Sequence, residues 1–270
     1  MKGIQIGGLT NVVGGNVSGI QLGGLVNLNM LNTYGIQTGG LTNVNLGRTR
    51  GLQLAGLTNF NLYNTKGVQI GGLINSVVGD FSGLQLAGLV NLEGLRKSDS
   101  LDNTQNAAQF QIAGIANYGR KINGLQTAGI ININRDTMNG VQISGIYNHT
   151  GVLNGLQVGL INYADSIDHG ISLGLINIVS NGYRSIQLSS NESFPLNLSV
   201  KSGGKHFYTH AKLSAGEHLS GAGLGLGFTS NSNRRLSFYT EVVDQVVVGD
   251  NGIDIEYLGS FISSHIGLNL

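Results

Sequence analysis

The segment from Asp168 to Gly174, Asp-His-Gly-Ile-Ser-Leu-Gly, carries the residue types of a nucleophilic catalyst. Its last five residues match the Gly-x-Ser-x-Gly pattern, in which a serine on a sharp strand-to-helix turn attacks a carbonyl group. That chemistry needs an acid and a histidine further along the chain, whereas Asp168 and His169 come directly before Ser172. Ser172 also falls where the other copies of a repeat carry glutamine. We therefore predict that Ser172 is structural and that the chain is not an enzyme.

Two further groups have the composition of metal sites. His206 and His210 have a spacing that allows a shared metal on a helix, but on a strand they lie roughly 13 Å apart. Asp250, Asp254 and Glu256 crowd a predicted hairpin without the ligand spacing of a calcium loop. We expect no metal site and no cofactor.

The composition excludes other classes of function. Charged residues make up 11% of the chain and the net charge is +1, against roughly 25% charged residues in ordinary soluble domains. No run of lysine and arginine offers a surface to a phosphate backbone, so we expect no nucleic-acid partner. The chain has no cysteine, which excludes disulfide bonds and thiolate metal ligands.

The elements that position these residues follow a short repeat. Its clearest copies are Gly3-Ile-Gln-Ile-Gly-Gly-Leu-Thr-Asn11, Gly51-Leu-Gln-Leu-Ala-Gly-Leu-Thr-Asn59 and Gly83-Leu-Gln-Leu-Ala-Gly-Leu-Val-Asn91. The first six copies begin at residues 3, 19, 35, 51, 67 and 83, a period of 16. A fixed short period predicts units that stack on their neighbours and bury an apolar side between them. We predict an all-β fold, with a β-solenoid of about eleven coils of 15–16 residues over residues 1–180.

Each copy keeps two amide positions. The first six copies give the rows Gln5, Gln21, Gln37, Gln53, Gln69 and Gln85, and Asn11, Asn27, Asn43, Asn59, Asn75 and Asn91. In parallel, in-register strands about 4.8 Å apart, identical amides hydrogen-bond along the stack. We therefore predict two structural ladders.

The phase of the apolar residues indicates a corner in each copy. In the copy that starts at Gly51, leucines stand at Leu52, Leu54 and Leu57, which breaks strict alternation. A bulge or corner at Ala55-Gly56 would restore Leu57 to the inner face.

The alternative architecture is a single transmembrane β-barrel in which each copy forms one strand and a turn. It would make the protein an outer-membrane pore or anchor, since 9–11 residues span a bilayer. Such barrels carry aromatic girdles, but the aromatic residues of positions 1–91 are only Tyr34, Phe60, Tyr63 and Phe81. We favour the solenoid.

An insertion interrupts the repeat at residues 92–108. The segment is rich in charge and holds Glu93, Arg96, Lys97, Asp99 and Asp102. Insertions in solenoids map to loops on one face and often mark a binding site. We interpret it either as a partner-binding loop or as a solvated loop without a function.

Residues 181–270 lose the period and predict an antiparallel meander that caps the solenoid. The predicted strands are Phe194–Lys201, Lys205–Leu213, Gly221–Thr229, Arg235–Val248 and Ile253–Leu270. The strand Gly221–Thr229 has one face made of glycine, which permits close approach of an aromatic ring from the next strand.

The repeats resemble a family of mostly uncharacterised bacterial surface-repeat proteins from Gram-negative envelopes. The resemblance rests on the Gly-Leu-Gln-x-Ala-Gly-Leu-x-Asn copies and continues through Ile178–Arg184 and Asn191–Phe194. It implies a location at the cell surface or outer membrane and no known catalytic residues. The family usually carries an export signal. None precedes Gly3, so we expect the chain to be a mature or trimmed form.

Together these patterns predict a non-enzymatic, surface-associated structural or interaction protein. Its repetitive scaffold would contact a protein, polymer or lipid partner. The first coil presents a strand edge with one charge, Lys2, and unprotected edges template further pairing. We expect self-association through this coil or a natural segment upstream of it.

Overall fold

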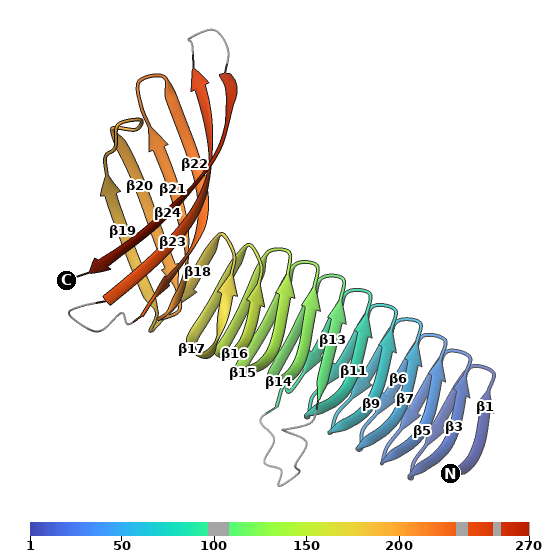
Figure 1. The fold of residues 1–270 in the computed structure, drawn as a ribbon. Helices are drawn as coiled ribbons and strands as arrows, with labels where there is room; N and C mark the ends of the chain where they lie inside the picture. Colours follow the sequence, from blue (N-terminus) through green and yellow to red (C-terminus); the bar gives the residue numbers. More distant parts are fainter. Residues whose placement is uncertain (97–107, 231–236, 251–254, 270) are drawn as a thin grey trace. The chain divides into compact units, whose positions relative to one another are not determined.

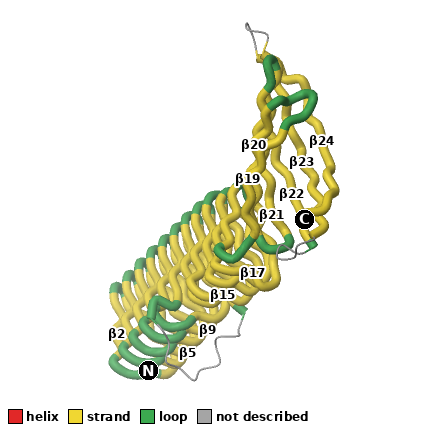
Figure 2. The backbone as a smooth tube through the Cα atoms, turned by 90° about the vertical axis from the view of Figure 1, so that its left-hand side faces the viewer, coloured by secondary structure: helices red, strands yellow, loops and turns green. Residues whose placement is uncertain are grey.

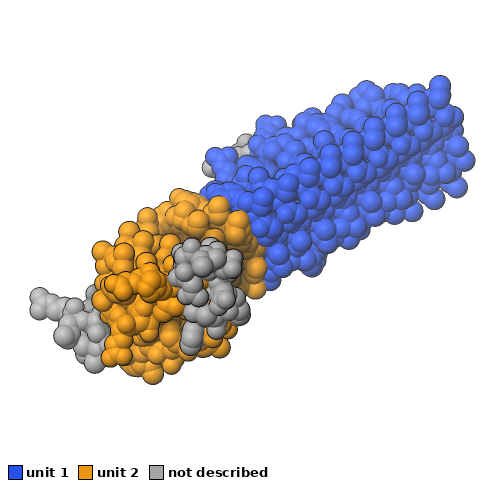
Figure 3. Space-filling model, turned by 90° about the horizontal axis from the view of Figure 1, so that it is seen from above, with its two compact units in different colours: residues 1–151 blue, residues 152–270 orange. Residues whose placement is uncertain are grey.

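The computed structural model describes residues 1–96, 108–230, 237–250 and 255–269, and within these ranges every regular element is a strand (Figure 1). The chain forms two compact units, residues 1–151 and residues 152–270 (Figure 3). The predicted all-β class is confirmed: a β-solenoid is followed in the chain by an antiparallel sheet.

Each of the first six coils consists of a longer and a shorter strand joined by two bends. The longer strands are β1 (Lys2–Gly7), β3 (Val17–Gly23), β5 (Thr33–Gly39), β7 (Thr49–Ala55), β9 (Thr65–Gly71) and β11 (Phe81–Ala87). The shorter strands are β2 (Thr10–Val13), β4 (Val26–Asn29), β6 (Thr42–Asn45), β8 (Thr58–Asn61), β10 (Ile74–Val77) and β12 (Val90–Glu93). The first unit continues with β13 (Gln109–Ala113), β14 (Ala116–Ala128), β15 (Ile131–Ser144) and the start of β16 (Tyr147–Val158).

Successive coils of the first unit run parallel and in register. Strand β5 pairs with β7 so that Gln37 lies beside Gln53, and β6 pairs with β8 so that Asn43 lies beside Asn59. Figure 2 shows the coils stacked with their bends aligned. Parallel stacking of equivalent residues is the arrangement expected of a solenoid, and it confirms the interpretation of the 16-residue period.

Two glycines of most copies are required by the close stacking of backbones; the copy after the insertion has Gln109 at the first of these positions. Gly51 has a φ of +143°, and a Cβ atom on it would lie 1.9 Å from the carbonyl oxygen of Gly35 in the preceding coil. A Cβ atom on Gly56, at the bend, would lie 2.1 Å from the oxygen of Gly40. Side chains at these positions would push the coils apart, which explains the glycine spacing.

The interior of the coils is polar, and this overturns one expectation. Gln53 and Asn59 are buried, whereas Leu57 is 40% exposed at the bend. The expectation that each copy buries its apolar side, with Leu57 on the inner face, is therefore wrong. Strand residues alternate between two faces, and because Gln53 points inward, its neighbours Leu52 and Leu54 point outward. The corner at Ala55-Gly56 is present, but it turns the chain without returning Leu57 to the interior.

The two predicted amide ladders are confirmed, and their hydrogen bonds run in opposite directions. The Nδ2 atom of Asn59 donates to Oδ1 of Asn75 in the next coil at 2.9 Å. The Nε2 atom of Gln69 donates to Oε1 of Gln53 in the preceding coil at 2.9 Å. The same directions recur from coil to coil along each row. The amide dipoles of the two rows therefore oppose each other.

The inserted segment differs from the predicted loop at its start. Glu93 is the last residue of β12 and is buried inside the coil, so it is not part of an exposed partner loop. Arg96 is exposed, as expected. The other residues proposed for the loop, Lys97, Asp99 and Asp102, lie outside the described residues.

The second unit joins the last repeat copies to the antiparallel sheet. It contains the end of β16, then β17 (Ile161–Leu173) and β18 (Ile176–Val179), which pair parallel. The sheet consists of β19 (Tyr183–Ser189), β20 (Leu196–Gly203), β21 (Phe207–Ala215), β22 (Leu219–Thr229), β23 (Ser237–Asp250) and β24 (Ile255–Asn269). Five of these match predicted strands; β19 was not predicted. Parallel pairing ends at β18, close to the predicted boundary at residue 180, while the compact units divide at residue 151.

Within this unit the sheet covers the end of the amide ladder. Asn177, in the last copy, donates from Nδ2 to Oγ1 of Thr209 on β21 at 2.7 Å. Ser202 on β20 hydrogen-bonds to the carbonyl oxygen of Asn177. These bonds satisfy groups that a further coil would otherwise satisfy, which is the role of a capping element in a repeat protein.

Candidate functional site

The most extensive feature of the first unit is a row of aliphatic side chains along one bend of the coils. We call this row the aliphatic ridge; it consists of Leu9, Leu25, Leu41, Leu57, Leu73, Leu89, Ile115, Ile130 and Ile146. Their exposed fractions lie between 38% at Leu89 and 66% at Leu9. Contiguous exposed apolar rows of this length are unusual on soluble proteins and mark surfaces that contact a partner or a membrane.

The backbone amide donors of the ridge are hydrogen-bonded to the preceding coil. The amide of Leu57 donates to the carbonyl oxygen of Leu41 at 2.9 Å, and the amide of Thr58 shares that acceptor at 3.0 Å. The amide of Gly56 donates to the oxygen of Gly39. The same pattern recurs at the neighbouring coils. The ridge can therefore leave water without exposing unpaired backbone donors, the condition that an apolar medium imposes.

Charged residues gather at the other bend of the coils and at the adjoining strand ends. The basic ones are Arg48, Arg50, Lys66, Arg96, Arg120, Lys121 and Arg135, and the acidic ones are Asp80 and Asp136. Arg120 forms an ion pair with Asp136, Nε to Oδ2, at 3.4 Å. From Arg48 onward the first unit thus has an aliphatic edge and an edge at which charged residues gather.

A single acidic side chain lies inside the first unit, among the residues that the structure describes. Glu93 is 2% exposed and accepts hydrogen bonds from the amides of Arg120 at 3.0 Å and Phe81 at 3.3 Å. Burial raises its pKa to about 8; these backbone hydrogen bonds oppose the rise, and the charge of Asp80 adds to it. Glu93 is therefore largely protonated at neutral pH and acts as a buried polar group, not as a site for a partner.

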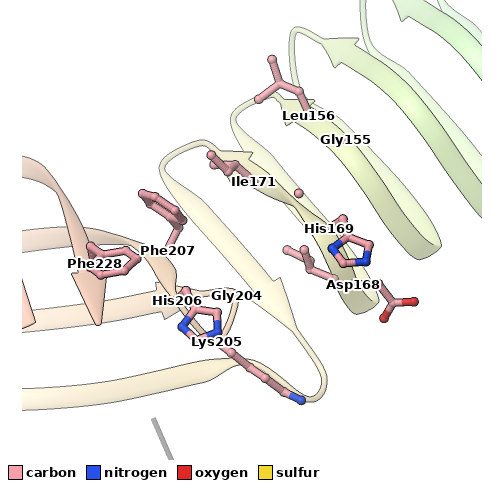
Figure 4. Close-up of a pocket in the computed structure, with 12 residues that line it drawn as sticks. Gly155, Leu156, Asp168, His169, Ile171, Gly204, Lys205, His206, Phe207 and Phe228 are labelled. Carbon is pink, nitrogen blue, oxygen red and sulfur yellow. The ribbon is translucent and has the colours of Figure 1, made fainter. Parts of the chain in front are cut away.

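A cleft of the second unit lies between the last repeat copies and the turn that joins β20 to β21 (Figure 4). Its volume is about 780 Å³. Phe207 and Phe228 pack edge to face on one side, with ring centroids 5.1 Å apart. Ile171, Asp168 and His169, all on β17, line the other side. The walls are mainly apolar, and the few polar groups do not converge on one point.

The structure confirms that Ser172 is a ladder residue. Its hydroxyl group is buried and donates to Oε1 of Gln157 at 3.0 Å, in place of the glutamine of other copies. Asp168 and His169 line the cleft, whereas Ser172 points into the interior of the coil. The next regular element is the strand β18, not a helix, so the arrangement required of a nucleophilic serine is not formed.

The six-stranded sheet also has an apolar outer face and a polar inner face. Exposed aliphatic residues on the outer face include Leu198, Val200, Leu213, Leu224, Leu226 and Val242. The glycines of β22 lie on the inner face, where a Cβ atom on Gly227 would lie 2.2 Å from the Tyr208 ring. An aromatic ring does approach the glycine face closely, but it comes from the preceding strand, β21, and not from the next strand as predicted.

An ionised cluster lies on the inner face. The Oε1 atom of Glu241 forms an ion pair with Nζ of Lys201 at 2.5 Å and accepts a hydrogen bond from the hydroxyl group of Tyr208 at 2.7 Å. The Nδ1 atom of His210 lies 3.5 Å from the other carboxylate oxygen, Oε2. Burial alone would raise the pKa of Glu241, but His210, Lys201 and Tyr208 outweigh it and lower that pKa to about 2. The sequence singled out only His210 from this cluster.

The possible metal ligands are not brought together. His206 Nδ1 lies 3.0 Å from the carbonyl oxygen of Thr229, whereas His210 faces Glu241. The side chains of Asp250, Asp254 and Glu256 lie outside those described. Among the described residues, no group of three or more histidine, aspartate or glutamate side chains is arranged to bind a metal ion.

Comparison with known proteins identifies no relative. No family model, no curated protein and no solved structure matches the chain. Within the described ranges, no helix long and apolar enough to span a membrane is found.

Proposed function

We propose that this chain is a non-enzymatic, surface-associated scaffold whose aliphatic ridge inserts into the apolar layer of a lipid surface. The observation that carries the proposal is the inverted coil, with amides inside and an unbroken row of leucine and isoleucine outside. Apolar outside and polar inside is the pattern of β structures that face lipid.

Three features support lipid over a protein partner. The ridge is convex, because it follows the bend of each coil, and two convex ridges would meet only along a line, whereas fluid acyl chains conform to it. The backbone amides at the bend donate their hydrogen bonds within the protein. The charged residues stand at the other bend, so insertion of the ridge desolvates no charge.

Flotation of the full chain with phosphatidylcholine vesicles tests the proposal. The test variant replaces Leu41, Leu57 and Leu73 by glutamine. Each of these leucines contributes on the order of 1 kcal/mol when it enters lipid, so we expect the partition coefficient to fall at least about tenfold.

A matched control replaces three side chains of similar exposure at the other bend, Met30, Leu31 and Tyr63, by glutamine. This variant should float like the parent, and circular dichroism should show both variants folded. Equal flotation of the two variants would contradict the proposal. Absence of flotation together with concentration-dependent association of the parent would instead favour a second copy of the chain as the partner.

A further inference from the structure

A small pocket lies on the polar inner face of the six-stranded sheet, apart from the cleft and the ridge. Its volume is about 80 Å³, and a water molecule needs only about 10–15 Å³ measured in this way. Gln187 and Ser189 come from the edge strand β19, and His265 comes from the other edge strand, β24. The sheet therefore curls until both of its edges line one pocket.

The lining of this pocket is rich in basic groups. Lys201, Lys212, His210 and His265 line it together with one acidic side chain, Glu241. Glu241 is engaged by Lys201 and balances its charge. Among the described residues of the lining, no acidic side chain then remains to pair with Lys212, which stands beside two histidines. Such a lining disfavours a metal ion and favours an anion.

His210 provides an independent indication of a ligand. Its side chain is 5% exposed, and neither ring nitrogen has a hydrogen-bond partner among the residues that the structure describes. The Nδ1 atom lies 3.5 Å from Oε2 of Glu241, which is an ion-pair distance too long for a good hydrogen bond. Buried polar groups without a partner are rare, and an occupant of the pocket is one way to supply it.

We propose that this pocket binds a small oxyanion, either phosphate or a carboxylate group. Lys212 and His210 supply the principal donors, and the hydroxyl group of Ser199 and the amide of Gln187 stand in the same lining. Charge-assisted hydrogen bonds of this kind are stronger than neutral ones. Because the lining extends from β19 to β24, the bound anion links the two edge strands of the sheet.

Isothermal titration of the full chain at constant pH and ionic strength tests the site. The probes are inorganic phosphate, acetate and glycerol phosphate, with chloride as the reference ion. We expect saturable binding of phosphate or acetate that chloride does not reproduce. If glycerol phosphate binds as tightly as phosphate, the natural ligand is a larger molecule with a terminal phosphate group. If glycerol phosphate does not bind, the natural ligand is a free ion.

Two variants locate the binding. Lys212→Met and His210→Gln should each weaken binding of the preferred anion about tenfold or more, since each removes a charge-assisted hydrogen bond. Lys205→Met, an exposed lysine outside the pocket, should leave the affinity unchanged. If His210→Gln does not fold, the test rests on Lys212→Met. Lys212 is partly exposed, so we expect this variant to fold.

No saturable binding by the parent, or equal affinity of Lys212→Met and Lys205→Met, would overturn the inference. The site is independent of the proposed function. The glutamine variant of Leu41, Leu57 and Leu73 should retain anion binding while losing flotation.

Discussion

The solenoid interior of the first unit and the inner face of the six-stranded sheet solve the same problem differently. Both place polar side chains inside and aliphatic ones outside. In the solenoid each side chain meets its own copy above and below, as Asn43 meets Asn59. An amide has both a donor and an acceptor, so identical amides satisfy one another, whereas identical charges would repel. In the antiparallel sheet, side chains of different types meet across the face, and opposite charges such as Lys201 and Glu241 pair.

Two buried glutamates, one in each region, reflect this difference in their protonation. Glu93 lies in the solenoid interior, in register with Val77 and beside Phe81, where burial raises its pKa to about 8. Glu241 is also buried, but its partners in the sheet, His210, Lys201 and Tyr208, lower its pKa to about 2. Burial alone does not decide the protonation state of a carboxyl group; the partners that the topology allows decide it.

The largest expected effect comes from breaking the charge pairing of the sheet. Replacing Glu241 by leucine leaves Lys201, which is 6% exposed, without its counter-ion. Removing one partner of a buried ion pair costs about 3–5 kcal/mol. We expect urea unfolding to show a loss of that size.

The double variant Lys201→Met with Glu241→Leu provides the control. It removes both charges and should recover most of the lost stability, because an apolar pair of similar volume replaces a buried ion pair at little cost. If the double variant is no more stable than Glu241→Leu alone, the charge pairing is not the source of the loss.

The second effect comes from interrupting a ladder. Asn59→Leu removes a hydrogen-bond partner from three groups: Nδ2 of Asn43, Oδ1 of Asn75 and the carbonyl oxygen of Ile70. Nδ2 of Asn43 keeps its second bond, to the carbonyl oxygen of Leu54. Each unsatisfied buried group lowers the free energy of unfolding by about 1–3 kcal/mol. The apolar surface that the leucine side chain buries offsets part of this loss. We expect a net loss of about 2–4 kcal/mol in urea unfolding.

The neighbouring substitution Thr58→Leu is the matched control for Asn59→Leu. Thr58 faces outward in a row that already holds Val26 and Ile74. Its replacement should leave the free energy of unfolding nearly unchanged. Equal losses at Thr58 and Asn59 would mean that leucine is harmful in this strand for a reason other than the ladder.

The third effect is a pH dependence that belongs to Glu93. Because its folded pKa is raised from 4.5 to about 8, the native state binds the proton more tightly than the unfolded state. Its contribution to stability is complete below about pH 4.5 and is lost as the pH rises to about 8, with a slope of at most about 1.4 kcal/mol per pH unit. Glu93→Gln should flatten this slope in urea unfolding of the full chain.

The pH range of the stability change also distinguishes Glu93 from Glu241, the buried carboxylate of the sheet. The depressed pKa of Glu241 contributes stability above its unfolded value, which is lost only as the pH falls towards about 2. Glu93→Gln should therefore leave the acid limb of the stability curve intact. A slope between pH 5 and 8 that persists in this variant would show that another group titrates there.

The repeat allowed the ladders and the stacking to be predicted, but not which side faces inward. The period of 16 and the invariant amides identify equivalent residues of successive coils, and parallel pairing follows. Both faces of each strand are regular, however: Gln53 alternates with Leu52 and Leu54. The usual preference for buried leucine then gives the wrong choice, because a ladder satisfies amides that would otherwise be costly to bury.

The polar cluster of the sheet could not be predicted from the sequence. Lys201 and Glu241 are 40 residues apart, and they meet only because β20 and β23 share one curled face. Antiparallel register depends on turns that composition fixes only loosely. Strand β19, Tyr183–Ser189, was missed although the turn signal Asn181-Gly182 directly precedes it, because this segment resembles a junction between the repeats and the sheet.

The smallest effect compares two threonines of one row that differ only in their hydrogen bonds. Thr33 and Thr49 pair in register and are both buried. The Thr33 hydroxyl donates to Oδ1 of Asn45 at 2.9 Å and accepts from Nδ2 of Asn29 at 3.1 Å. The hydroxyl of Thr49 has no partner among the described residues. Identical residues in equivalent coils are therefore not equally satisfied.

Valine substitutions at these two positions should change the free energy of unfolding by amounts that differ in sign or size. Thr33→Val removes two hydrogen bonds and should cost about 1–2 kcal/mol, since it leaves polar atoms of the asparagine row without a partner. Thr49→Val removes an unsatisfied hydroxyl of nearly the same shape, and should be neutral or stabilising by up to about 1 kcal/mol. Urea unfolding of the two variants measures the difference. Equal losses would mean that the Thr49 hydroxyl finds a partner in solution, such as a buried water, and that the solenoid interior satisfies its polar groups as completely as the charge pairs of the sheet do.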